Sequence, residues 1–216
     1  MGVQLMAVPR PRALLFDWDN TLVDTWPCIG RATNITLETM GLKPWTPAEI
    51  RERVAGSLRD TFPKIYGDRW EQAREVYYRA FEQVHLEMLT ELPGAGDFLA
   101  AAAKAGLYLG VVSNKTGKYL RQEAAHMGWD KHFKRLIGAQ DAPRDKPEID
   151  PVLMAMDASG LTLDKDVWFV GDAAIDVICA QNAGCTSVLL HAAANTDPAA
   201  QIHAADFSAL RNVAGI

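Results

Sequence analysis

The sequence contains few cysteines and no pair of them at the spacing of a metal or redox site. Cys28, Cys179 and Cys185 are the only three among 216 residues, and none belongs to a Cys-x-x-Cys motif. Three thiols are too few for a disulfide framework, so we expect free cysteines in a reducing compartment, which favours a cytoplasmic location. The five histidines lack the spacing to cysteines or acids that is typical of zinc ligands, so zinc is not expected.

An excess of positive charge is also lacking. The chain has 22 lysines and arginines against 27 aspartates and glutamates, which gives a formal net charge of −5 at pH 7. No general basic surface is available to attract nucleic acid or an acidic membrane. An anionic ligand must therefore meet a local positive group or a metal.

Long hydrophobic runs are absent as well. No run approaches the roughly 18 consecutive apolar residues of a membrane span, and the first residues lack the basic region of a signal peptide. We therefore expect neither a membrane nor a nucleic acid as partner. A monomer and a homodimer are both compatible with the sequence.

The apolar residues that are present form short runs typical of buried strands. From residue 107 onward these runs alternate with helical stretches, which predicts a doubly wound parallel sheet of the Rossmann-like α/β class. The predicted strands are residues 13–16, 107–112, 135–137, 167–170 and 187–190, and the predicted helices are 116–127, 150–158 and 173–183.

A helical insert is predicted directly after the first strand. Pro27 suits the first turn of a helix and Gly41 suits a helix end. Asp68 and Glu71 resemble a capping box, and apolar residues then follow at three- and four-residue spacing as far as residue 88. We interpret residues 25–90 as an all-helical unit inserted into a core of residues 1–24 and 91–216.

Acidic residues stand where the first strand ends. Asp17 and Asp19 follow the run 13–16, and open α/β sheets bind ligands at the carboxyl ends of their strands. The run 167–170 leads in the same way to Asp172 and to Asp176 four residues later. Carboxylates that converge in a crevice repel one another, so a cation is needed, and Mg²⁺ is the natural choice because it prefers hard oxygen ligands.

Groups that suit a phosphate lie at two further positions. Ser113 and Asn114 end the second core strand just before a helix, where a hydroxyl and backbone N–H groups could bind an anionic oxygen. Lys146 precedes a proline that disfavours helix, and its ammonium could neutralise a phosphoryl oxygen.

Taken together, the motifs resemble those of the haloacid dehalogenase-like phosphohydrolases. The order Asp-x-Asp-x-Thr, Ser-Asn, Lys-Pro and Gly-Asp-x-x-x-Asp extends from Asp17 to Asp176. The helical insert resembles the cap of the phosphoglycolate-phosphatase-like branch. Asn20 stands where that family most often has glycine, and asparagine tolerates an unusual turn conformation.

The resemblance implies a role for each motif residue. Asp17 would be the nucleophile that forms an aspartyl-phosphate, and Asp19 would act as general acid and then as general base. Thr21 would steady this loop and Asp19. Ser113, Asn114 and Lys146 would hold the phosphoryl oxygens, and Asp17, Asp19 through its backbone carbonyl, Asp172 and Asp176 would hold Mg²⁺.

The expected activity is hydrolysis of a phosphate monoester of a small metabolite, with phosphoglycolate as the leading substrate. A sugar-phosphate mutase or a phosphonate hydrolase of the same superfamily is an alternative, and a phosphoaspartate receiver module or a catalytically idle binding protein is a non-enzymatic one. Arg59 is the candidate for substrate selection, because a guanidinium suits a carboxylated phosphate ester.

Overall fold

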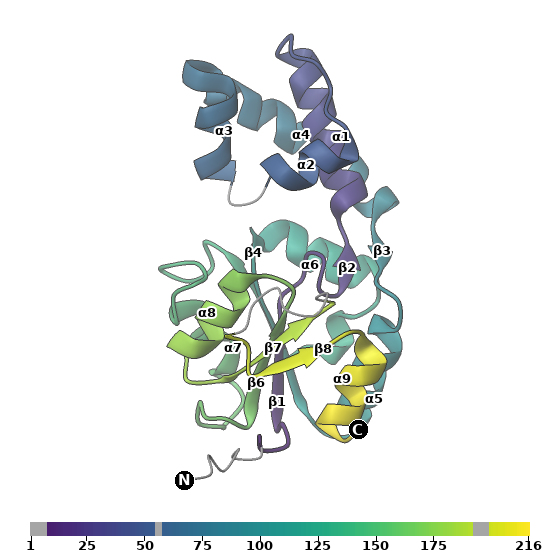
Figure 1. Ribbon diagram of the computed structural model, residues 1–216, viewed down its shortest axis with the longest axis vertical. Coiled ribbons are helices and arrows are strands. Elements are labelled where there is room, and N and C mark those ends of the chain that lie inside the picture. Colours follow the sequence, from purple (N-terminus) through teal and green to yellow (C-terminus); the bar gives the residue numbers. More distant parts are fainter. Residues whose placement is uncertain (1–7, 55–57, 192–198) are drawn as a thin grey trace. The chain divides into compact units, whose positions relative to one another are not determined.

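The computed structural model describes residues 8–54, 58–191 and 199–216 (Figure 1). The chain divides into two compact units. One consists of Met1–Val23 and Glu91–Ile216, and the other of Asp24–Thr90. The boundaries of the insert predicted from the sequence lie between residues 24 and 25 and between residues 90 and 91.

A six-stranded sheet forms the centre of the larger unit, and every strand in it runs parallel to its neighbours. The strand order is β5-β4-β1-β6-β7-β8, so the first strand of the chain lies inside the sheet between β4 and β6. In chain order the strands are β1 (Ala13–Phe16), β4 (Tyr108–Thr116), β5 (Arg135–Ala139), β6 (Val167–Gly171), β7 (Thr186–Leu190) and β8 (Ile202–Ala204).

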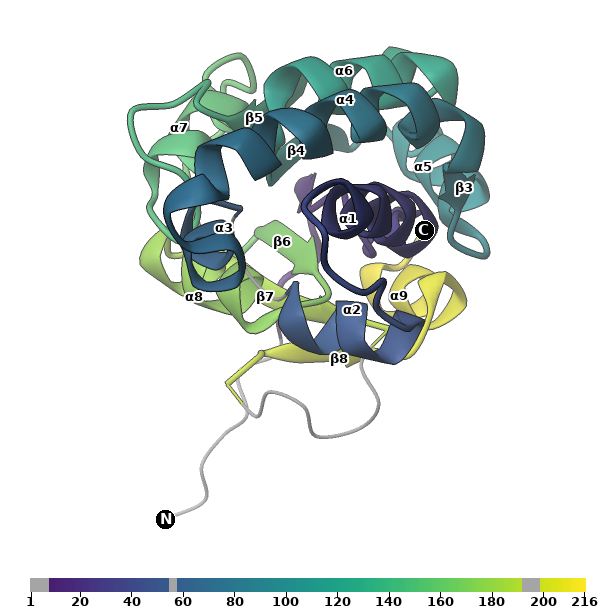
Figure 2. The ribbon, with the colours of Figure 1, turned by 90° about the horizontal axis from the view of Figure 1, so that it is seen from above.

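Helices cover both faces of this sheet. Figure 2 shows α7 and α8 on one side of it and α5 and α9 on the other. α6 packs on β4 and β5, and both α5 and α6 contact the short helix η2. The bounds are α5 (Ala95–Lys104), α6 (Gly117–His126), η2 (Asp130–His132), α7 (Asp150–Met156), α8 (Ala174–Asn182) and α9 (Phe207–Ala214).

The side chains of β1 build the core on both faces because they alternate along the strand. Ala13 and Leu15 join the apolar cluster formed with α7 and α8. Phe16 points to the opposite layer, where its ring meets Phe98 of α5 edge to face at 6.1 Å between centroids. All four residues of β1 are buried, so the strand is fixed where it leads into the acidic loop.

The smaller unit has a core of its own, built from helices. The described helices are α1 (Trp26–Thr39), α2 (Pro47–Arg53), α3 (Leu58–Tyr66), the short η1 (Gly67–Arg69) and α4 (Trp70–Met88). α1 and α4 pack on each other. Along α3 and α4, the rings of Phe62, Tyr77, Phe81 and His85 contact one another in sequence, and all four residues are buried.

The prediction of an α/β fold with a parallel sheet and a helical insert is confirmed. The predicted capping box at Asp68 and Glu71 is wrong, because η1 occupies this position and α4 begins without a side-chain cap. A capping box instead starts α2, where Thr46 and Glu49 bond reciprocally. The sequence patterns also left out β8, α9 and the short pair β2 (Val23–Asp24) and β3 (Thr90–Glu91). Among the described residues, no helix combines the length and apolarity that a membrane crossing requires.

Candidate active site

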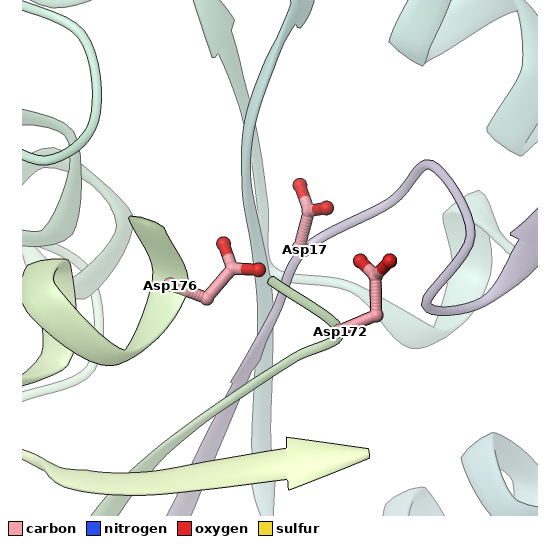
Figure 3. A group of neighbouring side chains, drawn as sticks. All are labelled: Asp17, Asp172 and Asp176. Atoms are coloured by element: carbon pink, nitrogen blue, oxygen red, sulfur yellow. The ribbon is translucent and has the colours of Figure 1, made fainter. Parts of the chain in front are cut away.

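Three carboxylates meet at the carboxyl edge of the sheet. Asp17 directly follows β1, Asp172 directly follows β6, and Asp176 lies in the first turn of α8. Figure 3 shows the three side chains gathered at this edge, and one carboxylate oxygen of each lies within 4.8 Å of the others. Asp17 and Asp176 are buried, and Asp172 is half-buried. Because hard oxygen ligands at such separations suit a divalent cation, these residues fit a Mg²⁺ site.

Lys146 is the cation that accompanies this acidic cluster. Its Nζ donates to Asp17 Oδ1 at 2.7 Å and to Asp176 Oδ1 at 2.8 Å, and its side chain is only 2% exposed. Burial acts to lower the pKa of this ammonium, but the charges of Asp17 and Asp176 outweigh burial and hold the pKa above its usual range. Lys146 therefore stays charged at neutral pH.

One ammonium does not balance three ionised carboxylates. Burial, followed by the charges of Asp17 and Asp176, raises the pKa of Asp172 to about 7. Burial also raises the pKa of Asp176, against the lowering effect of Lys146. With every carboxylate ionised, three negative charges face one positive charge, so the cluster carries two unbalanced negative charges. A divalent cation supplies the charge that this excess requires.

Backbone and hydroxyl groups hold the carboxylates in place. Thr21 Oγ1 donates to Asp172 Oδ1 at 3.0 Å, and the backbone N–H of Ala173 donates to Asp176 Oδ2 at 3.1 Å. Gly171 makes room for this arrangement, because a Cβ there would lie 2.3 Å from the Asp176 carboxyl carbon. We expected Thr21 to steady the loop and Asp19, which stays a prediction; the contact of its hydroxyl is with Asp172.

The loop after Asp17 adopts the unusual turn that the sequence required. Asn20 has a left-handed backbone with φ of 61°, and its N–H donates to the carbonyl of Val23 at 2.7 Å. His191, at the end of β7, contacts the carbonyl of Thr21 through Nε2 at 3.1 Å. This loop is thus tied both to itself and to the residue that follows β7.

Asp19 is not a member of this group of three carboxylates. We expected four aspartates to converge, but the Asp19 carboxylate accepts a hydrogen bond from Lys115 Nζ at 2.6 Å. Lys115 also forms an ion pair with Glu123 at 3.1 Å. Lys115 directly follows the Ser-Asn motif in the sequence. No sequence pattern indicated that it would contact Asp19 or Glu123. A metal contact through the backbone carbonyl of Asp19 stays a prediction.

The Ser-Asn motif contacts its surroundings through side chains. Asn114 donates to the carbonyl of Lys146 at 3.1 Å and accepts from its N–H at 3.0 Å, so its amide braces the loop that holds the site's lysine. Ser113 is buried, and its Oγ accepts from the N–H of Lys115 at 3.2 Å. Phosphate binding by these two residues stays a prediction. Arg59 belongs to α3, and its side chain lies outside the described residues.

Comparison with known proteins identifies the class of protein that combines this sheet with this acidic cluster. The family model of the haloacid dehalogenase-like hydrolases matches residues 14–190. The chain is 27% identical over 192 residues to a phosphoglycolate phosphatase from Chromobacterium violaceum, covering 85% of this chain and 86% of that protein. It is 28% identical over 180 residues to an N-acetylmuramic acid 6-phosphate phosphatase from Pseudomonas aeruginosa, covering 81% and 79%.

A solved structure shows the same fold. The crystal structure of a predicted phosphoglycolate phosphatase from Haemophilus somnus superposes with a TM-score of 0.81 at 23% identity, covering 95% of this chain and 98% of that one. The chain therefore belongs to the haloacid dehalogenase-like hydrolases. It is an enzyme of their phosphatase-like group, as the motifs predicted.

The charge excess predicts that an active-site substitution stabilises the metal-free protein. Replacement of Asp172 by asparagine removes one of three repelling charges and keeps a side chain of the same shape. In EDTA at pH 8, Asp172→Asn should raise the free energy of unfolding by on the order of 2 kcal/mol. The gain should shrink as the pH falls from about 7 to about 4, because wild-type Asp172 takes up a proton in the folded state within that window.

Urea unfolding of the metal-free proteins at several pH values measures this effect. The control is Asp164→Asn, which neutralises an exposed carboxylate outside the cluster and should change stability by less than about 0.5 kcal/mol. Added Mg²⁺ should stabilise the wild type more than Asp172→Asn. A variant that is less stable than the wild type in EDTA at pH 8 would contradict the repulsion argument.

Proposed function

We propose that this protein is a Mg²⁺-dependent phosphatase that hydrolyses a phosphate monoester of a small metabolite through an aspartyl-phosphate on Asp17. The observation that supports this most strongly is the environment of Asp17. Its carboxylate contacts the Lys146 ammonium and lies close to the carboxylates of Asp172 and Asp176, and its side chain is 11% exposed. A carboxylate beside a fixed cation, at the ligand-binding edge of a parallel sheet, suits attack on phosphorus.

Lys146 orients the nucleophile and neutralises charge. Its contact with Asp17 Oδ1 leaves the other carboxylate oxygen to attack. The same ammonium can meet a phosphoryl oxygen, because a lysine has three donors and two of them are used on carboxylates here. Phosphoryl transfer depends mainly on such positioning and neutralisation.

Asp172 and Asp176, together with Asp17, would hold Mg²⁺. The bound cation would neutralise the phosphoryl group and so allow one anion to approach another. Thr21 keeps Asp172 oriented towards this role, and the N–H of Ala173 does the same for Asp176. Both contacts act on the carboxylates before any ligand arrives.

Asp19 would supply and recover the proton. It would protonate the leaving oxygen while the P–O bond breaks, and it would then take a proton from the water that attacks the aspartyl-phosphate. Its side chain is 25% exposed, so substrate and water can reach it.

The substrate class is proposed from the relatives. Phosphoglycolate and N-acetylmuramic acid 6-phosphate, the substrates named for two of them, each contain a phosphate ester and a carboxylate. We propose a carboxylated phosphate monoester for this protein, with phosphoglycolate as the first compound to assay. A mutase would instead pass the phosphoryl group to a sugar, so release of inorganic phosphate in the absence of any sugar separates the two activities.

Replacement of Asp17 tests the nucleophile. Purified wild type with Mg²⁺ should release inorganic phosphate from 4-nitrophenyl phosphate, and Asp17→Asn should reduce kcat by at least roughly 10³-fold because an amide is not a nucleophile towards phosphorus. Asp164→Asn is the matched control and should keep full activity. An Asp17→Asn enzyme as active as the wild type would overturn this mechanism.

Replacement of Arg59 tests substrate selection. If the guanidinium binds the substrate carboxylate, Arg59→Ala should raise KM for phosphoglycolate by roughly tenfold or more and leave hydrolysis of 4-nitrophenyl phosphate unchanged. Arg79→Ala, at an exposed position of α4, is the control for loss of a positive charge in the helical unit. Equal loss on both substrates would show that Arg59 does not recognise the carboxylate.

A further inference from the structure

The Asp19 carboxylate is held by a lysine that belongs to none of the four motifs. Lys115, in the last residues of β4, donates to Asp19 Oδ1 at 2.6 Å. The Lys115 side chain is 5% exposed, whereas that of Asp19 is 25% exposed. The ion pair therefore has a buried end at the ammonium and an accessible end at the carboxylate.

A second buried carboxylate fixes the ammonium from behind. Glu123 of α6 has no exposed surface, and its Oε2 lies 3.1 Å from Lys115 Nζ. The same oxygen accepts a hydrogen bond from the indole Nε1 of Trp18 at 2.7 Å. Because Trp18 and Asp19 are adjacent in the chain, the contacts close a ring from Trp18 through Glu123 and Lys115 to Asp19.

The ring is anchored in an aromatic layer. Trp18 has no exposed surface and meets the rings of Trp129 and Phe133 edge to face, at 5.9 and 6.4 Å between centroids. The two fully buried residues of this ring of contacts, Trp18 and Glu123, thus have fixed positions. The accessible end is the carboxylate that the proposed function assigns to proton transfer.

Stability alone is a poor explanation for this arrangement. Removing an ammonium and a carboxylate from water is unfavourable, and apolar residues of similar volume commonly stabilise such a site equally well or better. What an ion pair adds is a defined position for its charged groups. Here the only partly accessible group in the ring is Asp19.

We propose that Lys115, fixed by Glu123, is a positioning residue that holds Asp19 for proton transfer. The proposal rests on the proposed function of Asp19 and adds to it the pair that sets its geometry. Lys115 neither gives nor takes a proton. Its contact with Oδ1 leaves Oδ2 for the transfer.

The proton balance of the two half-reactions involves Asp19 alone. In the first, the proton on Oδ2 moves to the leaving oxygen, which keeps the electron pair of the breaking P–O bond. Asp19 is then a carboxylate beside the Lys115 ammonium. In the second, this carboxylate takes a proton from water as the water oxygen attacks phosphorus and releases Asp17.

The test uses esters that differ in how much they need an acid. Phenyl phosphate, 4-nitrophenyl phosphate and 2,4-dinitrophenyl phosphate have similar shapes, and the leaving phenol becomes more acidic along the series. For Lys115→Met, kcat/KM should fall by roughly 10²-fold on phenyl phosphate and by less than about threefold on 2,4-dinitrophenyl phosphate, because only the poor leaving group requires a well-placed proton. The inhibition constant of inorganic phosphate should change by less than about twofold.

Two further variants separate positioning from folding. Lys115→Met leaves Glu123 buried without its cation, so the double variant Lys115→Met/Glu123→Gln removes both charges and keeps an acceptor for the Trp18 indole. It should show the same dependence on the leaving group with a thermal unfolding transition near that of the wild type. Lys104→Met, at an exposed position of α5, should match the wild type on all three esters.

The outcomes distinguish this inference from the proposed function. A folded double variant that loses activity equally on all three esters, or loses none, would overturn the role of Lys115 while the phosphatase assignment stands. A large rise in the inhibition constant of phosphate would make Lys115 a phosphate ligand and would also overturn it. A wild type that hydrolyses none of the three esters would refute the proposed function and this inference with it.

Discussion

The repulsion among three carboxylates at one edge of a parallel sheet is the constraint on which the rest of the site depends. Asp17, Asp172 and Asp176 come from two strand ends and a helix, and Lys146 is the cation that contacts two of them. Carboxylates this close and this buried do not stay together without fixed partners. The hydrogen bonds from Thr21, from the Ala173 N–H and from Asn114 to the lysine loop are the means by which the chain keeps this repelling group assembled.

Repulsion between carboxylates also bears on Asp17 and Asp19, which are two residues apart in the chain and have different surroundings. Asp17 faces Lys146 and the other carboxylates, whereas Asp19 turns to Lys115, and Lys115 is in turn fixed by Glu123. Separate cations keep the two carboxylates from competing for one partner. The nucleophile and the proton donor that we propose require different environments, and the turn between Asp17 and Asp19 provides them.

The sequence predicted the acidic cluster but not the contacts behind it, for a physical reason. Parallel strands end at a common edge, so strand-end residues such as Asp17 and Asp172 are brought together by topology alone. The partners of Asp19 depend on side-chain directions instead. Lys115 lies 96 residues away in the chain, and periodicity contains no information on such a pair. The strand β8 was left out for a related reason, since three residues that include an exposed His203 do not form an apolar run.

The charged contacts of the site belong to one of the two units of the chain. The contacts described above for the acidic cluster and for the Asp19 ring are made by residues outside Asp24–Thr90. The helical unit has its own buried aromatic series, which includes Phe62, Tyr77 and Phe81. Under the role that we propose for Arg59, substitutions on the surface of the helical unit would alter substrate recognition, and the contacts of Asp17 and Lys146 described above would stay as they are.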